Sequence, residues 1–208
     1  MNAAARRGRP SPMRSFDPHR VGALECRAWV TYYRREWVGL LVASVGLVHA
    51  GFRMSWSRTL RGAWLVLRAN QLWAPPVDND PDGARRCMER FYRLVAEDSG
   101  ETVDTAEAAR LEVDWWRAHR LVQHGGEDGA ADRHQELVDA LVRLYAYTYR
   151  AAPGEVEPAA ALRAEAMDVS DRWVAEGCDP DSPLVGEERA LLVRSYAALL
   201  SAVHRPPP

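Results

Sequence analysis

Residues 37–52, WVGLLVASVGLVHAGF, contain no Asp, Glu, Lys or Arg. If this segment is a helix, apolar side chains lie on all of its sides. Such a helix needs protein or lipid all around it. At about 1.5 Å per residue it would span about 24 Å, less than the roughly 30 Å hydrocarbon core of a bilayer. We therefore expect a buried core helix. Membrane association through residues 37–52 is an alternative that we do not favour.

Helix caps and helix breakers divide the rest of the chain. Asp followed by Pro starts helices near residues 17 and 80, and Asp104 with Glu107 matches a capping box. Gly and Pro residues mark most of the helix ends. No segment alternates polar and apolar residues, so we expect no sheet. The predicted helices span residues 17–52, 55–73, 81–100, 104–124, 132–150, 157–176 and 182–204.

This pattern predicts an all-α, single-domain bundle of about seven helices with a central apolar helix. We expect residues 17–204 to form the domain. The Pro- and Arg-rich residues 1–16 and the residues 205–208 are expected to be disordered tails.

The composition excludes several classes of protein. A chain of 208 residues with 47% hydrophobic residues and a net charge of −2 is typical of one globular domain, not of a basic nucleic-acid binder. Every basic side chain is Arg, a bias typical of high-GC bacterial genomes. The 3 cysteines are widely spaced, and no apolar signal segment follows the N-terminus. We therefore expect a cytoplasmic protein without disulfides.

Arg7-Gly8-Arg9-Pro10 matches the core of an AT-hook, a short motif that places Arg in a narrow minor groove. The motif occurs once, and the charge of the chain gives it no support. We interpret it as part of a solvated tail and do not expect nucleic acid as a partner.

Residues 78–89, DNDPDGARRCME, match the calcium-binding loop of an EF-hand. Asp78, Asp80 and Asp82 stand at its first three ligand positions and Glu89 at its last. Pro81 stiffens this loop, however, and no second loop is present to pair with it. The interpretation we favour is simpler: Asp80 is the N-cap of a helix and Pro81 is its first residue.

A second candidate metal site combines acidic residues and histidines from different helices. Glu112 and His119 share one face of the helix 104–124, and Glu25, Glu36 or His49 could meet them from another helix. The Glu-x-x-His signature of di-iron bundles is absent. We predict no cofactor and keep a metal ion as the alternative.

A candidate ligand pocket lies where a helix ends near Trp73. Arg68 and Asn70 precede this end, and Trp116 and His119 could face it from the helix 104–124. The alternative is a solvated loop, because helix ends need polar partners. The chain is also rich in aromatic residues, with 8 Trp and 7 Tyr, and aromatic residues are enriched in cores and interfaces.

We expect a protein-interaction or small-ligand-binding module, with a second copy (a homodimer) or another protein as the partner. The alternative from a different class is a metal- or cofactor-dependent helical-bundle enzyme. No nucleophile elbow, phosphate loop or zinc-protease motif occurs, so the sequence assigns no catalytic residue.

Overall fold

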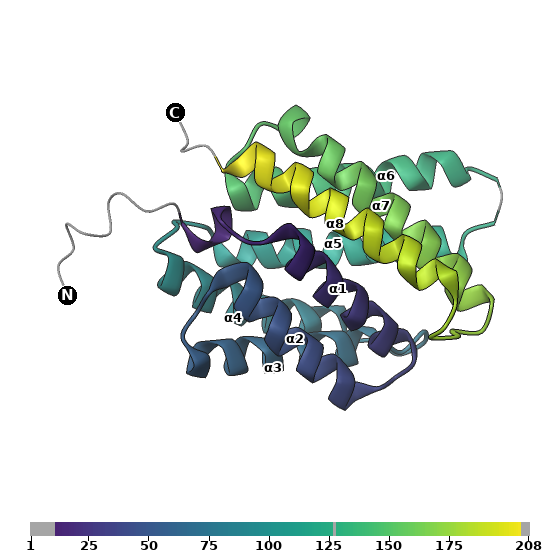
Figure 1. Ribbon diagram of the computed structural model, residues 1–208, viewed down its shortest axis with the longest axis horizontal. Coiled ribbons are helices and arrows are strands. Elements are labelled where there is room, and N and C mark those ends of the chain that lie inside the picture. The colour runs from purple at the N-terminus through teal and green to yellow at the C-terminus, as the bar shows by residue number, and fades with distance from the viewer. Residues whose placement is uncertain (1–10, 127, 205–208) are drawn as a thin grey trace.

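The computed structural model describes residues 11–126 and 128–204, and over these residues the chain forms helices and no strands (Figure 1). The prediction of an all-α, single-domain bundle is confirmed, with eight α-helices in the described ranges instead of about seven. A short 3-10 helix precedes them. The elements are η2 (Pro12–Arg14), α1 (Pro18–Tyr33), α2 (Trp37–Phe52), α3 (Trp56–Trp73), α4 (Pro81–Ser99), α5 (Thr105–His124), α6 (Ala130–Tyr149), α7 (Pro153–Ala175) and α8 (Pro183–Val203).

Side-chain caps fix the starts of four helices. The carboxylates of Asp17, Asp80 and Asp104 accept hydrogen bonds from backbone N–H groups in the first turns of α1, α4 and α5, and the Ser182 hydroxyl does the same in α8. Each cap pairs an N–H group that has no partner within its own helix. These four starts lie where the sequence placed them.

The additional helix arises because the predicted helix 17–52 is interrupted. The chain turns between α1 and α2, where Arg35 adopts a left-handed conformation with φ 60°. The backbone N–H of Glu36 donates to the carbonyl of Thr31 at 2.8 Å and closes the turn. No Gly or Pro stands at residues 34–36, so the sequence lacks the usual signal for this break.

The eight helices form a closed ring. Each helix packs against the helices before and after it in sequence, and α8 packs against α1 as well as α7 (Figure 1). A helix with its side chains is about 10 Å across, so eight helices in a ring enclose more space than their own side chains readily fill. The closed ring therefore creates a central cavity.

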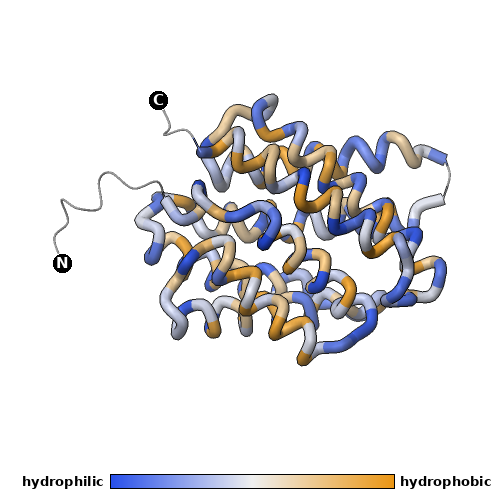
Figure 2. Tube along the Cα trace, in the orientation of Figure 1, coloured by the Kyte–Doolittle hydropathy of each residue, from blue (hydrophilic) through white to orange (hydrophobic). Residues whose placement is uncertain are grey.

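The position of α2 differs from the expected central helix. It is one member of the ring, packed between α1 and α3, and its side chains Val38 and Val42 are 79% and 54% exposed. Small residues explain how α2 packs so closely on α1: a Cβ atom at Gly39 would meet Thr31, and one at Gly46 would meet Leu24. The neighbouring helices therefore bury only some of the hydrophobic residues of α2, a segment rich in hydrophobic residues (Figure 2). No described helix is long and apolar enough to cross a membrane.

Residues 11–16 also differ from the expected tail. Met13 and Phe16 are buried, and Arg14 donates hydrogen bonds to the backbone carbonyls of Tyr149 at 2.7 Å and Val203 at 3.2 Å. This segment therefore packs against the ends of α6 and α8. The remainder of the predicted tails, including Arg7–Pro10, lies outside the described residues.

The closure of the ring depends on Gly22 in α1. A Cβ atom at this position would lie 2.7 Å from the backbone nitrogen of Val193 in α8. We expect Gly22→Ala to push the two helices apart and to lower the free energy of unfolding by about 1–3 kcal/mol, as measured by urea denaturation. Gly186→Ala, in the same α8 but with open space around it, is the control and should stabilise the protein by up to about 1 kcal/mol. Equal effects of the two substitutions would contradict this account of the closure.

Candidate ligand-binding cavity

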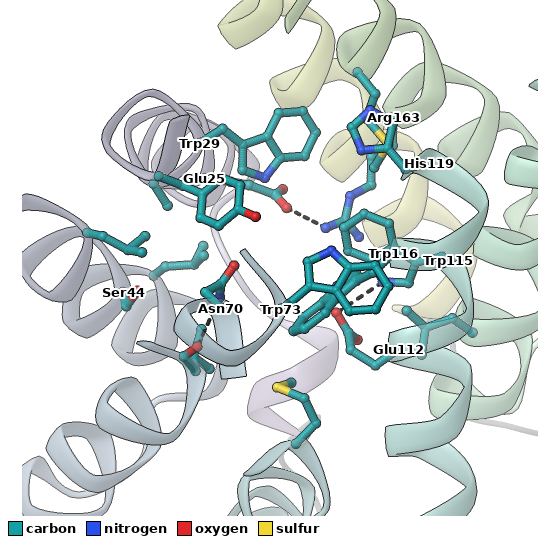
Figure 3. Close-up of a pocket in the computed structure, with 18 of the residues that line it drawn as sticks. Glu25, Trp29, Ser44, Asn70, Trp73, Glu112, Trp115, Trp116, His119 and Arg163 are labelled. Atoms are coloured by element: carbon teal, nitrogen blue, oxygen red, sulfur yellow. Dashed lines mark hydrogen bonds and ion pairs between the residues drawn. The ribbon is translucent and has the colours of Figure 1, made fainter. Parts of the chain in front are cut away.

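A cavity of about 580 Å³ occupies the centre of the ring (Figure 3). Residues from all eight α-helices line it. Protein interiors are close-packed, and their few voids are rarely much larger than a water molecule. Pockets that bind small molecules have volumes of roughly 300–1,000 Å³. The cavity therefore has the size of a ligand-binding site and is too large for a packing defect.

The cavity opens at one end of the ring. In the part of the chain that the structure describes, four of the lining residues are exposed, and all four lie at or just beyond the C-terminal ends of α1, α3, α5 and α7: Arg35, Pro76, His124 and Ala175. Buried residues such as Phe16 and Leu199 line the opposite end. A ligand would thus enter between these four helix ends.

A buried ion pair joins two sides of the cavity wall. The guanidinium of Arg163 in α7 donates to the carboxylate of Glu25 in α1 (Figure 3) and to the hydroxyl of Tyr145 at 3.0 Å. It also lies 4.8 Å from the ring centroid of Trp115. Burial alone would lower the pKa of Arg163, but Glu25 and the neighbouring tyrosines raise it well above its usual value. Arg163 is therefore charged when the protein is folded.

Each member of this pair keeps a polar atom without a partner. Oε2 of Glu25 and Nε of Arg163 are buried, and neither has a hydrogen bond among the described residues. Buried polar groups without partners are costly, and native proteins contain few of them. Both residues line the cavity, so a ligand that displaces the atoms now covering Nε and Oε2 supplies an acceptor for the first and a donor for the second.

Other polar side chains in the cavity wall are paired with each other. Glu112 accepts hydrogen bonds from the hydroxyl of Tyr92 at 2.6 Å and from the indole nitrogen of Trp115 at 3.0 Å. Burial and the Glu112 carboxylate raise the pKa of Tyr92 well above its usual value, so Tyr92 remains a neutral donor. These bonds hold Trp115 in a fixed orientation against the Arg163 guanidinium.

A second network lies nearer the mouth. Asp171 of α7 interacts with Nε2 of His119 at 3.2 Å and accepts from Gln123 at 2.6 Å. The same Gln123 amide donates to the hydroxyl of Tyr33 at 2.7 Å. Burial and the Asp171 carboxylate raise the pKa of Tyr33 well above its usual value. The network ties α1, α5 and α7 together beside the mouth.

The charges of the cavity wall balance. Three acidic and three Arg side chains line it: Glu25, Glu112, Asp171, Arg35, Arg120 and Arg163. The guanidinium of Arg120 covers the ring of Trp73 at 4.2 Å, just as Arg163 covers Trp115. Because cations of the protein already occupy these two aromatic faces, and the net charge of the wall is balanced, the cavity favours a neutral ligand over a cation or an anion.

Most of the predicted pocket residues line this cavity. Asn70, Trp73, Trp116 and His119 do so, although they come from two helices, α3 and α5. Arg68 does not line it: its side chain is exposed and donates to Gln71. The four residues meet because the C-terminal ends of α3 and α5 lie on the same side of the ring.

The predicted Glu/His metal site is not assembled. Glu25, Glu112 and His119 line the cavity, but His49 does not, because its ring stacks on the exposed Trp56 with centroids 4.3 Å apart. Among the described residues, no three His, Cys, Asp or Glu side chains are placed to hold a metal ion together.

The loop of the calcium alternative, residues 78–89, is not formed as such. Asp80 accepts from the backbone N–H of Gly83 at 2.7 Å and caps α4, which begins at Pro81. Glu89 is already in the third turn of this helix and pairs with Arg93 at 2.8 Å. An EF-hand requires residues 78–89 to form a loop around one centre, whereas here residues 81–89 are helical. Asp78, Asp82 and Glu89 are therefore not gathered at a site.

Sequence reasoning missed Arg163 and Asp171. The signal for Arg163 was its spacing: it lies four residues after Ala159 and four before Met167, both fully or almost fully buried on the inner face of α7. A charged residue in an apolar stripe marks a buried polar site. Asp171 continues the same row, four residues further on.

A further buried acid, Glu188 in α8, lies outside the cavity. Its side chain is 0% exposed, and neither carboxylate oxygen has a partner among the described residues. Burial raises its pKa to about 8, although the nearby Cys26 and Ser170 side chains lower it in part. Burial and Glu188 in turn raise the pKa of Cys26. Glu188 is therefore protonated at neutral pH.

No protein-family model, curated protein or solved structure matches the chain. The fold and the cavity nevertheless define a class: an all-α protein in which a closed ring of helices surrounds a central pocket that is open at one end.

Proposed function

We propose that the protein binds a neutral small molecule in the central cavity, one with an aromatic or apolar body and one hydroxyl group. The observation that carries this proposal is the cavity of about 580 Å³ together with the buried Glu25 in its wall, whose Oε2 atom has no hydrogen-bond partner within residues 11–126 and 128–204.

The body of the ligand follows from the wall. Four tryptophans line the cavity, and Figure 3 shows them around its centre: Trp29, Trp73, Trp115 and Trp116. Most other lining side chains are aliphatic or aromatic. Flat aromatic walls favour a flat aromatic ligand, because rings stack or pack edge-to-face at centroid distances of about 4.5–7 Å.

The hydroxyl follows from the two partnerless atoms. A carboxylate oxygen only accepts hydrogen bonds, and the Nε–H of Arg only donates. A hydroxyl group does both, so an alcohol or a phenol can donate to Glu25 and accept from Arg163. An amine offers no comparable acceptor, and an ether has no proton for Glu25.

A pair of probes tests this chemistry. We expect 1-naphthol to bind in isothermal titration calorimetry at least tenfold more tightly than 1-methoxynaphthalene, because a hydrogen bond to a charged group contributes about 1.5–3 kcal/mol. The two probes share the ring system, but the ether lacks the hydroxyl proton. Equal affinities would contradict the assignment of Glu25.

A pair of variants tests the location. Ser44 in α2 lines the cavity (Figure 3), whereas Val42 in the same helix is exposed on the outside. Ser44→Phe should reduce the affinity for 1-naphthol at least tenfold by filling the cavity, and Val42→Phe should leave it unchanged. Binding that survives Ser44→Phe, or no binding to the wild-type protein, would reject the proposal.

A further inference from the structure

An exposed apolar surface covers the outside of α2 and α3. We call it the α2–α3 face, and it consists of Val38, Val42, Trp56, Leu60 and Trp64, which are between 54% and 79% exposed. Single exposed apolar residues are ordinary, but neighbouring large ones on two adjacent helices mark an interaction surface.

The geometry of the helix pair joins these residues into one surface. The two helices pack against each other and are connected by residues 53–55 alone (Figure 1). Val38 and Val42 are one turn apart on α2, as are Leu60 and Trp64 on α3. The stacked rings of His49 and Trp56 link the two rows, with an angle of 11° between their planes.

The charge of this helix pair identifies the kind of partner. Residues 37–73 contain four Arg and no acidic residue, although the whole chain has a net charge of −2. Arg58 is paired with two acidic residues of α4, Asp98 at 2.7 Å and Glu97 at 3.8 Å. Arg61 and Arg68 are exposed and lie three residues before and four after Trp64, on the same side of α3. These two Arg side chains border the apolar surface on the α3 side.

This charge disfavours a second copy as the occupant. A two-fold interface would place the α2–α3 face against itself and bring like charges together. An anionic bilayer surface fits better: Trp side chains are enriched at membrane interfaces, Val and Leu enter the boundary of the acyl chains, and Arg interacts with lipid phosphates. We infer that the α2–α3 face docks this protein peripherally onto anionic membranes. Docking is separate from ligand binding, because α2 and α3 use their opposite, inner side chains to line the cavity.

Sedimentation with lipid vesicles tests the inference. We expect the full chain to bind vesicles of 30% phosphatidylglycerol in phosphatidylcholine at 50 mM salt. Its affinity for vesicles of pure phosphatidylcholine should be at least tenfold lower. Trp56→Ser with Trp64→Ser should reduce binding to the anionic vesicles at least tenfold. Arg61→Gln with Arg68→Gln should reduce it by about tenfold or more and weaken its dependence on salt.

Leu121→Ser is the matched control, because Leu121 is 50% exposed but lies on α5, and it should leave vesicle binding unchanged. Circular dichroism and thermal melting should show that all variants remain folded, as their side chains are exposed. No binding to anionic vesicles, or binding that the Trp variant retains, would overturn the inference. A third outcome would also overturn it: the wild-type protein is a dimer in analytical ultracentrifugation, the Trp variant is a monomer, and neither binds vesicles. The α2–α3 face would then be a protein interface.

Discussion

Arg163→Met is expected to lower the free energy of unfolding by about 3–5 kcal/mol, because it leaves the Glu25 carboxylate buried without its charged partner. Both side chains are nearly inaccessible, with exposed fractions of 10% and 5%, so the remaining carboxylate is poorly solvated. Tyr145 also loses its hydrogen bond from the guanidinium. At about 2–4 °C per kcal/mol for a chain of this size, the melting temperature should fall by roughly 10 °C.

Two controls separate the ion pair from the loss of an Arg side chain. The double variant Glu25→Gln with Arg163→Met removes both charges and should recover a large part of the lost stability. Arg143→Met replaces an exposed Arg on α6 and should change stability by less than about 0.5 kcal/mol. If the double variant were as unstable as the sum of its single variants, the buried charge on Glu25 would not be the cause.

Glu188 should make the stability of the protein depend on pH. Its pKa is raised from 4.5 to about 8 in the folded state, so between these values the unfolded state releases a proton that the folded state retains. Stability therefore falls as pH rises from about 4.5 to about 8. A shift of this size corresponds to a loss on the order of 4 kcal/mol.

Glu188→Gln should remove this contribution. We expect the variant and the wild-type protein to differ little near pH 4.5, and the variant to be more stable by several kcal/mol near pH 8, as measured by urea denaturation across the range. Glu187→Gln, at the exposed neighbouring position, is the control and should follow the wild-type profile. Parallel pH profiles for Glu188→Gln and the wild-type protein would contradict a buried, protonated Glu188.

Local signals in the sequence predicted most helix boundaries. The Asp and Ser caps act through the next two or three residues, so their effect can be read without knowing the fold. The break at Arg35 could not be predicted, because a left-handed Arg in the turn is held by packing between α1 and α2 and not by a Gly or Pro. The apolar segment 37–52 predicted a helix but not the position of that helix within the bundle. An apolar helix face that stays exposed has the same sequence pattern as one that is buried.

The cavity could be predicted only in part. Asn70, Trp73, Trp116 and His119 stood out as polar or aromatic residues near helix ends, and they do line it. The pairing of Glu25 with Arg163 depends on the closure of the ring by α8 and α1, which joins residues 138 positions apart. No local pattern encodes such a contact. The sequence of α7 indicates only that Arg163 is buried, because Arg163 stands between Ala159 and Met167 on the buried side of the helix.

A crystal structure of the protein grown with 1-naphthol would show whether the cavity binds a ligand. We expect the naphthalene ring between the tryptophans of the cavity, with the hydroxyl oxygen about 2.5–3 Å from Oε2 of Glu25 and within hydrogen-bonding distance of Nε of Arg163. Electron density for the probe only on the outer surface, or a cavity closed by inward movement of the helices with the probe excluded, would contradict this expectation.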